Sequence, residues 1–352
     1  MKRALILSGI SWNTTLQRHH KIAKWLKKMG YNVTFVESIP SSKITLKKVL
    51  VKIKSKIIKS SKIDNKKEVE IVNGKFLPPI FFFNVINSIK VKKLLKKIDN
   101  KYDVIVNYLP IYTTDKIIAK MEYNILIYDC VRDFENWGGY PANVKKYEDK
   151  LINNATIVLT DSFYLTNKKN GVQFLPSLSE EQLKIFNQKR NINSIKSIVY
   201  FGQIDTHIDT NILKMLSKDY DIHIIGNSKI QLNFRYNDHG FISSKEKLAK
   251  EIIKYDAIII PYKGNMDGVI PAKLIESLAT NMPVFISSFY DSEQMKEYCY
   301  VYHTEEELQE MLKKYNKLDR KNAKKIVYSN TEEKQYERFK EVLLNEKKQI
   351  VK

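Results

Sequence analysis

The chain has 352 residues and carries 60 lysines and arginines against 39 acidic residues, which gives a formal net charge of +21. This length suits two domains, each able to bury most of its apolar surface. The two cysteines, Cys130 and Cys299, lie far apart, which excludes a disulfide framework and indicates a reducing cytoplasm. The N-terminus lacks the features of a signal peptide, and no apolar run approaches the roughly 20 residues that span a bilayer. We therefore expect a cytoplasmic protein.

The positive charge calls for an anionic partner, and two polyanions suit it: nucleic acid and an anionic membrane surface. Residues 43–67 and 90–101 interleave lysine with Ile, Leu and Val, so both stretches are compatible with basic amphipathic helices. Between them, four phenylalanines flank a Pro-Pro pair in a predicted loop: Phe76, Phe81, Phe82 and Phe83. A basic rim around exposed aromatic side chains suits the inner face of a membrane. The alternative is that the lysines cover ordinary solvated faces and the phenylalanines belong to the core.

The first half of the chain alternates strands with a helix. A helix is predicted at residues 17–29, and strands are predicted at residues 3–7, 32–37, 104–107, 125–129, 157–160 and 173–175. This βαβ opening indicates a parallel sheet. We expect a first domain at residues 1–180, with a basic and aromatic insertion at about residues 41–101.

The end of the first strand offers a place for a ligand. Gly9 and Ser11 are small enough to let a ligand approach backbone N–H groups, and Trp12 and Arg18 follow them in the sequence. The segment lacks a G-x-G-x-x-G pattern, which counts against a dehydrogenase. Two adjacent histidines at the start of the helix point about 100° apart and make a poor metal pair.

Residues 128–133 (YDCVRD) leave a predicted strand at its carboxyl end, where open α/β sheets bind ligands. Asp129 and Asp133 are candidates for the base that removes a proton from a hydroxyl, and Asp133 is preferred. Arg132 is able to hold a phosphate or a sugar carboxylate through two hydrogen bonds. The alternative is that an acid at a strand end caps the next helix or closes a turn.

Residues 177–196 are polar and predict a connector, after which the alternation restarts. A second domain is expected at residues 196–330. Its predicted strands lie at residues 198–202, 222–226, 233–241, 257–261 and 283–286, and its predicted helices at residues 209–217 and 244–255, with a further helix between the last two strands. A closing helix is predicted at residues 332–345.

The most informative stretch is residues 258–287, which predict a buried strand, a loop, a helix and a second buried strand. Lys273 and Glu276 are three residues apart and share one face of the helix. A helix entered from the carboxyl end of a strand directs backbone N–H groups at phosphate, so the lysine suits a diphosphate and the glutamate suits ribose hydroxyls. Taken alone, such a pair is more often a solvated surface pair.

This stretch resembles the motif P-x-K-[LIF]-x-E-[YS]-L-A-x-[GN]-x-P-V of GT-B glycosyltransferases, in particular the group-1, family-4-like enzymes and the teichuronic-acid and glucuronosyl-transferase relatives. The matching residues are Pro271, Lys273, Leu274, Glu276, Ser277, Leu278, Ala279, Asn281, Pro283 and Val284. Residues 128–133 resemble the Y-D-x-x-D-D motif of the same family, and residues 200–205 and 239–262 resemble its segments before the nucleotide site. Many retaining members carry a glutamate where this chain has Gly268, so the stereochemistry of transfer stays open.

The resemblance implies two Rossmann-like domains facing a cleft, with residues 331–352 crossing back to the first domain. It implies that the first domain binds the acceptor and that the second binds a nucleotide-sugar donor. The acceptor-binding candidates are Gly9, Ser11, Trp12, Arg18 and Arg132. The donor-binding candidates are Gly202, Gln203, Tyr262, Asp267, Pro271, Lys273 and Glu276. Neither a metal nor another cofactor is expected, because cations and helix N–H groups can stabilise the departing diphosphate.

These observations lead to one hypothesis and two alternatives. The hypothesis is a glycosyltransferase that moves a sugar from a nucleotide-diphosphate donor, UDP-linked by preference, to a saccharide or lipid-linked acceptor in cell-surface polysaccharide biosynthesis. Such an enzyme would work in the cytoplasm, peripherally at the inner face of the plasma membrane. The first alternative is a nucleotide-sugar epimerase of the same fold. The second is a basic polyanion-binding protein, although the sequence shows neither an RNA-recognition signature nor a zinc pattern.

Overall fold

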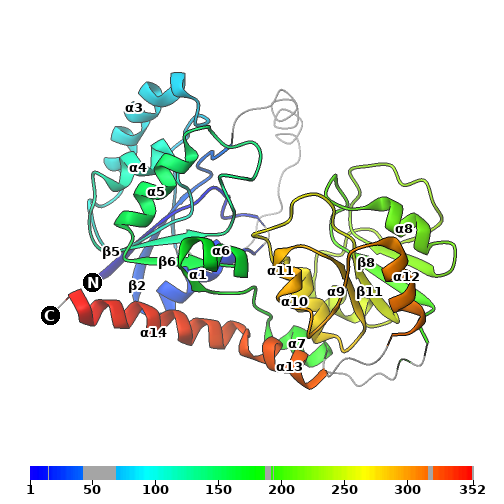
Figure 1. Cartoon of the computed structure of the whole chain (residues 1–352). Helices are drawn as coiled ribbons and strands as arrows, with labels where there is room; N and C mark the ends of the chain where they lie inside the picture. The colour runs from blue at the N-terminus through cyan, green and yellow to red at the C-terminus, as the bar shows by residue number, and fades with distance from the viewer. Residues whose placement is uncertain (15, 43–68, 187–191, 193, 316–319, 351–352) are drawn as a thin grey trace. The chain divides into compact units, whose positions relative to one another are not determined.

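The computed structural model describes residues 1–14, 16–42, 69–186, 192, 194–315 and 320–350. The chain forms two compact units (Figure 1). Unit 1 comprises Met1–Thr160, Leu165–Gln173 and Phe339–Lys352, and unit 2 comprises Asp161–Tyr164 and Phe174–Arg338. The basic stretch at residues 43–67, predicted as an amphipathic helix, lies outside the described residues.

Unit 1 contains a seven-stranded sheet in the order β3-β2-β1-β4-β5-β6-β7, with parallel pairing throughout. Its strands are β1 (Lys2–Leu7), β2 (Tyr31–Glu37), β3 (Glu70–Asn73), β4 (Lys101–Asn107), β5 (Glu122–Cys130), β6 (Ile157–Thr160) and β7 (Val172–Gln173). The central strands are continuous apolar runs that are buried on both faces, as expected where helices cover both sides of a parallel sheet.

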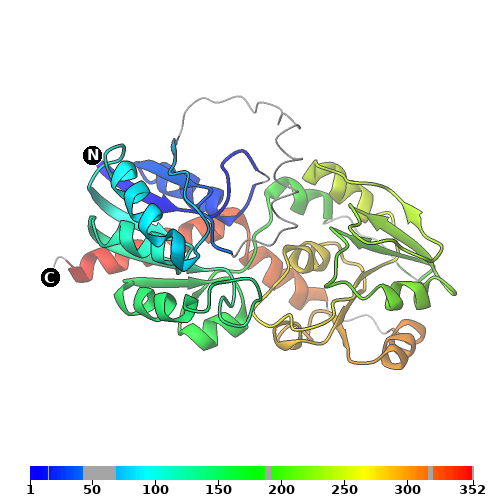
Figure 2. The same cartoon turned by 90° about the horizontal axis from the view of Figure 1, so that it is seen from above.

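The helices of unit 1 lie on both faces of this sheet (Figures 1 and 2). They are α1 (Arg18–Lys28), α3 (Asn84–Leu95), α4 (Tyr112–Ile118), α5 (Val144–Asn154) and α6 (Phe163–Lys169), with the short 3₁₀ helix η1 (Phe81–Phe83) before α3. On one face α3, α4 and α5 pack side by side. On the other, α1 meets the middle of the C-terminal helix α14 (Glu332–Ile350), where the ring centroids of Trp25 and Phe339 are 5.7 Å apart.

Unit 2 contains a six-stranded parallel sheet in the order β10-β9-β8-β11-β12-β13. Its strands are β8 (Ser197–Phe201), β9 (Asp221–Ile225), β10 (Asn237–Asp238), β11 (Ala257–Ile260), β12 (Val284–Ser287) and β13 (Tyr300–Tyr302). Its helices are α7 (Glu180–Phe186), α8 (Thr210–Leu216), α9 (Lys245–Ile252), α10 (Ala272–Ala279), α11 (Tyr290–Glu293), α12 (Glu305–Lys313) and α13 (Arg320–Ser329). Apolar side chains of α8 and α12 join one face of the sheet in a buried cluster.

The predicted α/β architecture of two parallel-sheet domains is confirmed. Two local predictions are wrong. The predicted strand at residues 233–241 pairs with its neighbour only at Asn237–Asp238, because its large side chains pack as partly buried residues at the edge of the core instead of continuing the ladder. The predicted polar connector contains α7, whose Leu183 and Phe186 are buried. No helix among the described residues is long and apolar enough to cross a membrane.

Candidate functional site

Each sheet reverses its direction of winding at one point, and several of the predicted ligand-binding residues follow the strands at those points. In unit 2 the chain runs from β8 to β9 and β10 on one side, and continues on the other side with β11. In unit 1 the corresponding neighbours are β1 and β4. The carboxyl ends of such neighbouring strands diverge and leave a crevice that binds ligands in open α/β sheets.

In unit 2 the donor-binding candidates meet around the side chain of Lys273. Its Nζ donates a hydrogen bond of 2.8 Å to the hydroxyl of Tyr200 and lies 4.2 Å from the centroid of the same ring. The ring centroid of Tyr262, after β11, is 5.5 Å from the amine. Burial lowers the pKa of Lys273 to about 7, although the charges of Glu276 and Asp205 act in the opposite direction. Among the residues that the structure describes, no carboxylate forms an ion pair with this amine.

Gly202 follows β8 and makes room for this amine. Its φ of +120° is a conformation that L side chains rarely adopt, and a Cβ at this position would lie 2.7 Å from Nζ of Lys273. The peptide after it is also fixed, because the carbonyl of Gln203 accepts a 2.8 Å hydrogen bond from the hydroxyl of Tyr200. The side chain of Gln203 points to Asp205, with a distance of 3.0 Å. The turn therefore places a backbone without a side chain beside a partly buried cation.

Glu276 lies one turn after Lys273 on α10 and is held by a residue that the sequence analysis missed. Oε1 of Glu276 accepts a 3.2 Å hydrogen bond from Nε2 of Gln182. Gln182 belongs to α7, is 2% exposed, and bonds the backbone of Ser179 through its own Oε1. Its segment was interpreted as a connector, so no sequence signal indicated this contact.

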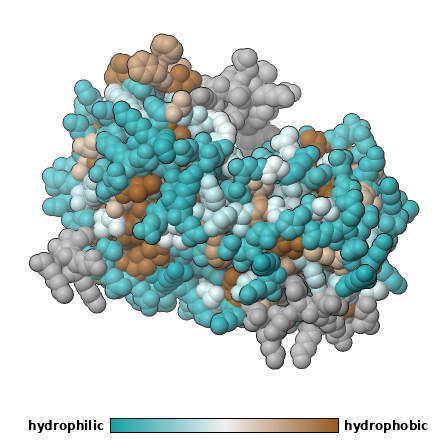
Figure 3. Space-filling model, viewed as in Figure 1, coloured by the Kyte–Doolittle hydropathy of each residue, from teal (hydrophilic) through white to brown (hydrophobic). Residues whose placement is uncertain are grey.

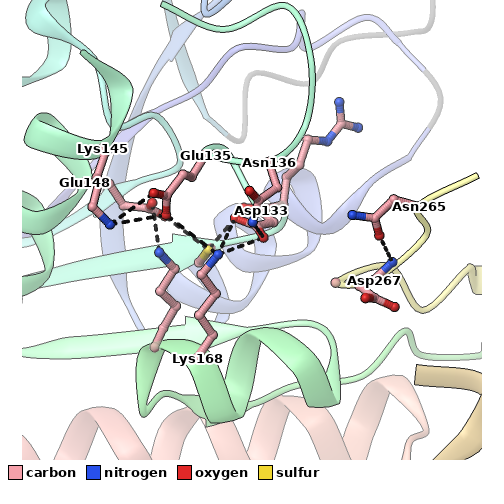
Figure 4. Close-up of polar contacts among 12 residues, drawn as sticks. Asp133, Glu135, Asn136, Lys145, Glu148, Lys168, Asn265 and Asp267 are labelled. Carbon is pink, nitrogen blue, oxygen red and sulfur yellow. Dashed lines mark hydrogen bonds and ion pairs between the residues drawn. The ribbon is translucent and has the colours of Figure 1, made fainter. Parts of the chain in front are cut away.

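The loop before α10 is fixed from both ends. The backbone N–H of Asp267 donates to Oδ1 of Asn265, and Oδ1 of Asp267 accepts from the N–H of Tyr290 (Figure 4). The N–H of Gly268 donates 2.9 Å to Oδ2 of Asp291, a fully buried carboxylate that the sequence analysis also missed. Burial raises the pKa of Asp291, partly offset by the backbone N–H groups that it accepts. Pro271 then begins α10 as its N-cap, with φ at −68°.

In unit 1 the turn after β1 is held by Glu37 at the end of β2. Oε2 of this carboxylate accepts hydrogen bonds from Oγ of Ser11 and from the N–H of Trp12, at 2.9 and 2.8 Å. A Cβ on Gly9 would lie 3.3 Å from the side chain of Leu109, so the two turns after β1 and β4 are in close contact. The predicted residues Gly9, Ser11 and Trp12 therefore form one rigid turn at the switch point of the sheet.

Arg18, at the start of α1, and Asp129, at the end of β5, form an ion pair. Nε of Arg18 donates to both carboxylate oxygens, at 2.9 and 2.8 Å, and Asp129 is fully buried. Next to Arg18, His19 stacks on Tyr108 and accepts or donates a 2.8 Å hydrogen bond with Ser8. Burial, followed by the charges of His20 and Arg18, lowers the pKa of His19 to about 3, so the imidazole is neutral. A carboxylate held in this way orients the arginine and is poorly placed to accept a proton.

Asp133 lies in the loop after β5, and its carboxylate is also engaged (Figure 4). It is 3% exposed and accepts hydrogen bonds from Lys168 of α6, at 2.9 and 3.1 Å, and from Asn136, at 2.8 Å. Burial alone would raise its pKa, but the hydrogen bonds from Lys168 and Asn136 outweigh it, and the pKa is lowered. Lys168 therefore keeps this acid ionised, and no sequence signal indicated that lysine.

Arg132 points to aromatic residues of the same loop. Its Nη1 donates 3.2 Å to the hydroxyl of Tyr140, and its guanidinium lies 4.9 Å from the ring centroid of Trp137. Behind the loop, Lys169 and Glu148 form a buried ion pair of 2.9 Å. No group of three or more metal-binding side chains occurs in the part of the chain that the structure describes.

The sequence matches no known family model, and it matches no curated protein. Several solved structures match across nearly the whole chain. Sucrose-phosphate synthase from Thermosynechococcus elongatus superposes with a TM-score of 0.70 at 13% identity, covering 98% of each chain. HepE from Anabaena, in complex with UDP, superposes with a TM-score of 0.66 at 10% identity, covering 98% of this chain and 100% of the other. A glycosyltransferase from Rickettsia africae has a TM-score of 0.63 at 14% identity, covering 100% and 98%.

These structural neighbours are GT-B glycosyltransferases. The similarity over nearly the whole length confirms the GT-B fold that the motif around Lys273 and Glu276 predicted. Helix α14 contributes to both units, because its residues from Phe339 onward belong to unit 1. At these identities the similarity establishes the fold, whereas the activity has to be argued from the residues of this chain.

Proposed function

We propose that the protein is a glycosyltransferase that transfers a hexosyl or related sugar from a nucleotide-diphosphate donor, preferentially UDP-linked. The single observation that carries the proposal is the partly buried amine of Lys273, which has no ion-pair partner among the described residues and lies beside the Gly202 turn. Removing a cation from water without an ion-pair partner is costly. A diphosphate at the turn would supply that charge, and the preference for UDP draws support from HepE structures solved with UDP and with UDP-glucose.

The remaining donor-binding candidates take roles that follow from this diphosphate. Glu276, oriented by Gln182, accepts hydrogen bonds from ribose hydroxyls. Tyr262 lines the nucleotide or sugar, and Gln203 adds a polar group at the pyrophosphate. Asp267 and Pro271 belong to the loop that recognises the sugar. Because Lys273 and the backbone N–H groups of the turn stabilise the leaving diphosphate, the reaction needs no metal.

The acceptor is proposed to bind unit 1 at the turns after β1 and β5. Gly9, Ser11 and Trp12 present a rigid turn, and Arg18 and Arg132 present guanidinium groups fixed by Asp129 and by aromatic rings. Between the two candidate acids, Asp133 is preferred as the base, because it lies in the loop after β5, whereas Asp129 is fully buried within the strand and paired with Arg18. Lys168 contacts both oxygens of Asp133 and keeps it ionised. The acceptor is a saccharide or a lipid-linked saccharide of cell-surface polysaccharide biosynthesis.

A cytoplasmic enzyme of this kind is proposed to work at the inner face of the plasma membrane. Large apolar side chains are exposed over η1 and the first half of α3, including Phe81 at 81%, Phe82 at 83% and Val85 at 72% (Figure 3). The second half of α3 exposes lysines instead, at Lys92 and Lys93. Apolar side chains beside cations suit an anionic lipid surface.

Thermal unfolding tests the proposal directly. The wild type, Lys273→Ala and the exposed-lysine control Lys214→Ala are melted with UDP, GDP, CDP and ADP in the presence of EDTA. A ligand at a hundredfold excess over its Kd stabilises by about 2.7 kcal/mol, which corresponds to a shift of about 5–11 °C for domains of this size. We expect a shift with UDP for the wild type and the control, and none for Lys273→Ala. An unchanged melting temperature of the wild type with all four nucleotides would refute the donor site.

Product analysis then separates a transferase from an epimerase. Incubation with UDP-glucose and an acceptor should release UDP and lengthen the acceptor. Conversion of the nucleotide-sugar into another nucleotide-sugar without release of UDP would instead identify an epimerase.

A further inference from the structure

Unit 1 contains an apolar pocket of about 470 Å³ on the side of α3, α4 and α5. Three chain segments form it: residues 79–84 before and at the start of α3, residues 110–112 between β4 and α4, and residues 141–147 at the start of α5. None of its lining residues carries a charge, although 28% of the chain is charged. Pro79, Pro110 and Pro141 fix the three segments, so the pocket is formed before a ligand arrives.

Four lining residues of the pocket carry polar side-chain groups: Asn84, Asn143, Tyr112 and Tyr147. The rings of the two tyrosines meet edge to face at 6.3 Å. The hydroxyl of Tyr112 is already engaged in a 2.8 Å hydrogen bond with Ser88. A saccharide site would need many convergent hydrogen-bonding groups to replace the water around sugar hydroxyls. The lining therefore favours a hydrocarbon ligand over a sugar.

The pocket is continuous with the exposed apolar surface of η1 and α3. Phe81 lines the pocket and is itself 81% exposed, and Phe82, Val85 and Ile89 extend the apolar surface from it (Figure 3). In the last turn of α3 and directly after it, the exposed side chains include lysines, which complement the negative charge of a lipid headgroup: Lys92, Lys93, Lys96 and Lys97. A lipid hydrocarbon chain that extends from an anionic bilayer at this surface would thus reach the pocket without crossing a charged region.

The pocket also adjoins the candidate acceptor turn. Pro110 lines it and directly follows Leu109, whose side chain would lie 3.3 Å from a Cβ on Gly9. Within unit 1, the apolar pocket and the predicted acceptor residues after β1 are therefore neighbours. We propose that this pocket binds the hydrocarbon chain of a lipid-linked acceptor, and that the part of the chain nearest the sugar is the part that it holds. This inference rests on the proposed function and narrows its acceptor from any saccharide to an amphiphile.

Alkyl maltosides below their micelle concentrations serve as probes, because they join a sugar headgroup to a chain of chosen length. Calorimetric titration of the wild type with hexyl, octyl and decyl maltoside should show affinity rising by up to about fourfold per methylene, equivalent to about 0.8 kcal/mol. Maltose itself should not bind detectably. Equal affinity for maltose and decyl maltoside would show a sugar site and overturn the proposal.

A pocket-filling variant distinguishes the pocket from the open surface. Ala142 lines the pocket and is exposed, so Ala142→Trp should fill the pocket without disturbing the core. It should lower the affinity for decyl maltoside at least tenfold. Ala119→Trp makes the same change at the exposed C-cap residue of α4, which does not line the pocket, and should bind like the wild type. If Ala142→Trp melts early, Asn143→Trp at the next exposed lining residue replaces it.

Four results would overturn the proposal or separate it from the proposed function. Wild-type affinity in a well-folded Ala142→Trp would place the amphiphile on the open surface. A wild-type dimer that Ala142→Trp dissociates without any amphiphile would assign the pocket to a second copy of the chain. The UDP melting shift, measured on the same samples, reports unit 2 independently. A UDP shift without chain-length dependence would reject the pocket alone, and chain-length dependence without a UDP shift would reject the donor site alone.

Discussion

The candidate donor residues of unit 2 and the candidate acceptor residues of unit 1 occupy equivalent places in their sheets, but their charges are compensated differently. In unit 1, Arg18 is paired with Asp129 and Lys168 with Asp133, whereas Arg132 contacts a hydroxyl and an aromatic ring. In unit 2, Lys273 contacts only a hydroxyl and two aromatic rings among the contacts described for its amine.

This difference indicates which unit receives the charged substrate. A paired site presents positioned hydrogen-bonding groups at little electrostatic cost, which suits the neutral hydroxyls of a sugar acceptor. A site whose partly buried cation has no ion-pair partner gains most from an anion. The pairing of Arg18 and Lys168 therefore agrees with the proposed assignment of the acceptor to unit 1 and of the diphosphate to unit 2, which the motif predicts.

The largest expected effect comes from removing the candidate base of unit 1. Asp133→Asn should lower kcat by about 10²–10⁴-fold, the range that general base catalysis contributes. It should leave the UDP melting shift intact, because Asp133 belongs to the other unit. The control is Glu135→Gln, which removes a neighbouring carboxylate 3.7 Å from Lys168 and should remain active. If Asp133→Asn keeps full activity, Asp133 is not the base and only positions Lys168.

A second variant tests the space beside Lys273. Gly202→Ala would place a Cβ 2.7 Å from Nζ of Lys273 at a φ of +120°, so the lysine has to move. We expect UDP affinity to fall by more than about tenfold, together with a loss of stability of about 1–3 kcal/mol from backbone strain. Gly30→Ala is the matched control, because Gly30 has a φ of +83° with no atom within 4 Å of the added Cβ. It should lose stability but keep its UDP affinity, as measured by calorimetry.

The lowered pKa of Lys273 predicts that UDP binding by unit 2 depends on pH. Unit 1 should show no such dependence. In the free protein the amine loses its proton above about pH 7, and a diphosphate binds the protonated form. UDP affinity should therefore fall by about tenfold per pH unit above pH 7, until the pKa of the complex is reached. Between pH 7 and the ordinary lysine value of 10.5, the unfolded chain binds the extra proton, so this group alone makes the unliganded protein more stable as pH rises.

Calorimetry checks this linkage by counting protons. In buffers of different ionisation enthalpy, UDP binding near pH 8 should take up a proton in the wild type. Lys273→Arg, whose guanidinium stays charged, should bind UDP with no such uptake. A flat affinity from pH 6.5 to 9 in the wild type would mean that Lys273 does not face the diphosphate.

The two regions also differ in how far the sequence predicted them. The GT-B fold and the meeting of Lys273, Gly202 and Tyr262 were predictable, because contiguous motifs carry these residues at the ends of apolar strands. In unit 1 the ligand turns were predictable from their position after strands, whereas their partners were not. Lys168 lies 35 residues from Asp133, and Arg18 lies 111 residues from Asp129. Only the folded chain shows that such distant charges are paired.

Polar composition misled the sequence analysis in one region of unit 2. The segment that contains α7 has many polar residues, so it was interpreted as a connector. Its Leu183 and Phe186 are nevertheless buried on one side of the helix, and Gln182 reaches Glu276. A short helix with two apolar anchors is too weak a pattern to separate from a loop, and a glutamine without a charge gives no signal for a site.

The smallest expected effect tests that missed residue. Gln182→Ala removes the 3.2 Å hydrogen bond to Glu276, and a bond of this kind contributes about 0.5–1.5 kcal/mol. UDP affinity should fall by about two- to tenfold, while Glu276 keeps its place through the helix. The change should act on the ribose: the ratio of affinities for UDP and 2′-deoxy-UDP should decrease in Gln182→Ala, because a less ordered carboxylate discriminates less. Gln309→Ala, on α12, is the matched control and should leave the ratio unchanged. An unchanged ratio in Gln182→Ala would show that Glu276 does not need Gln182 to be positioned. The side chains that orient Asp129 and Asp133 in unit 1 would then have no counterpart at Glu276 in unit 2.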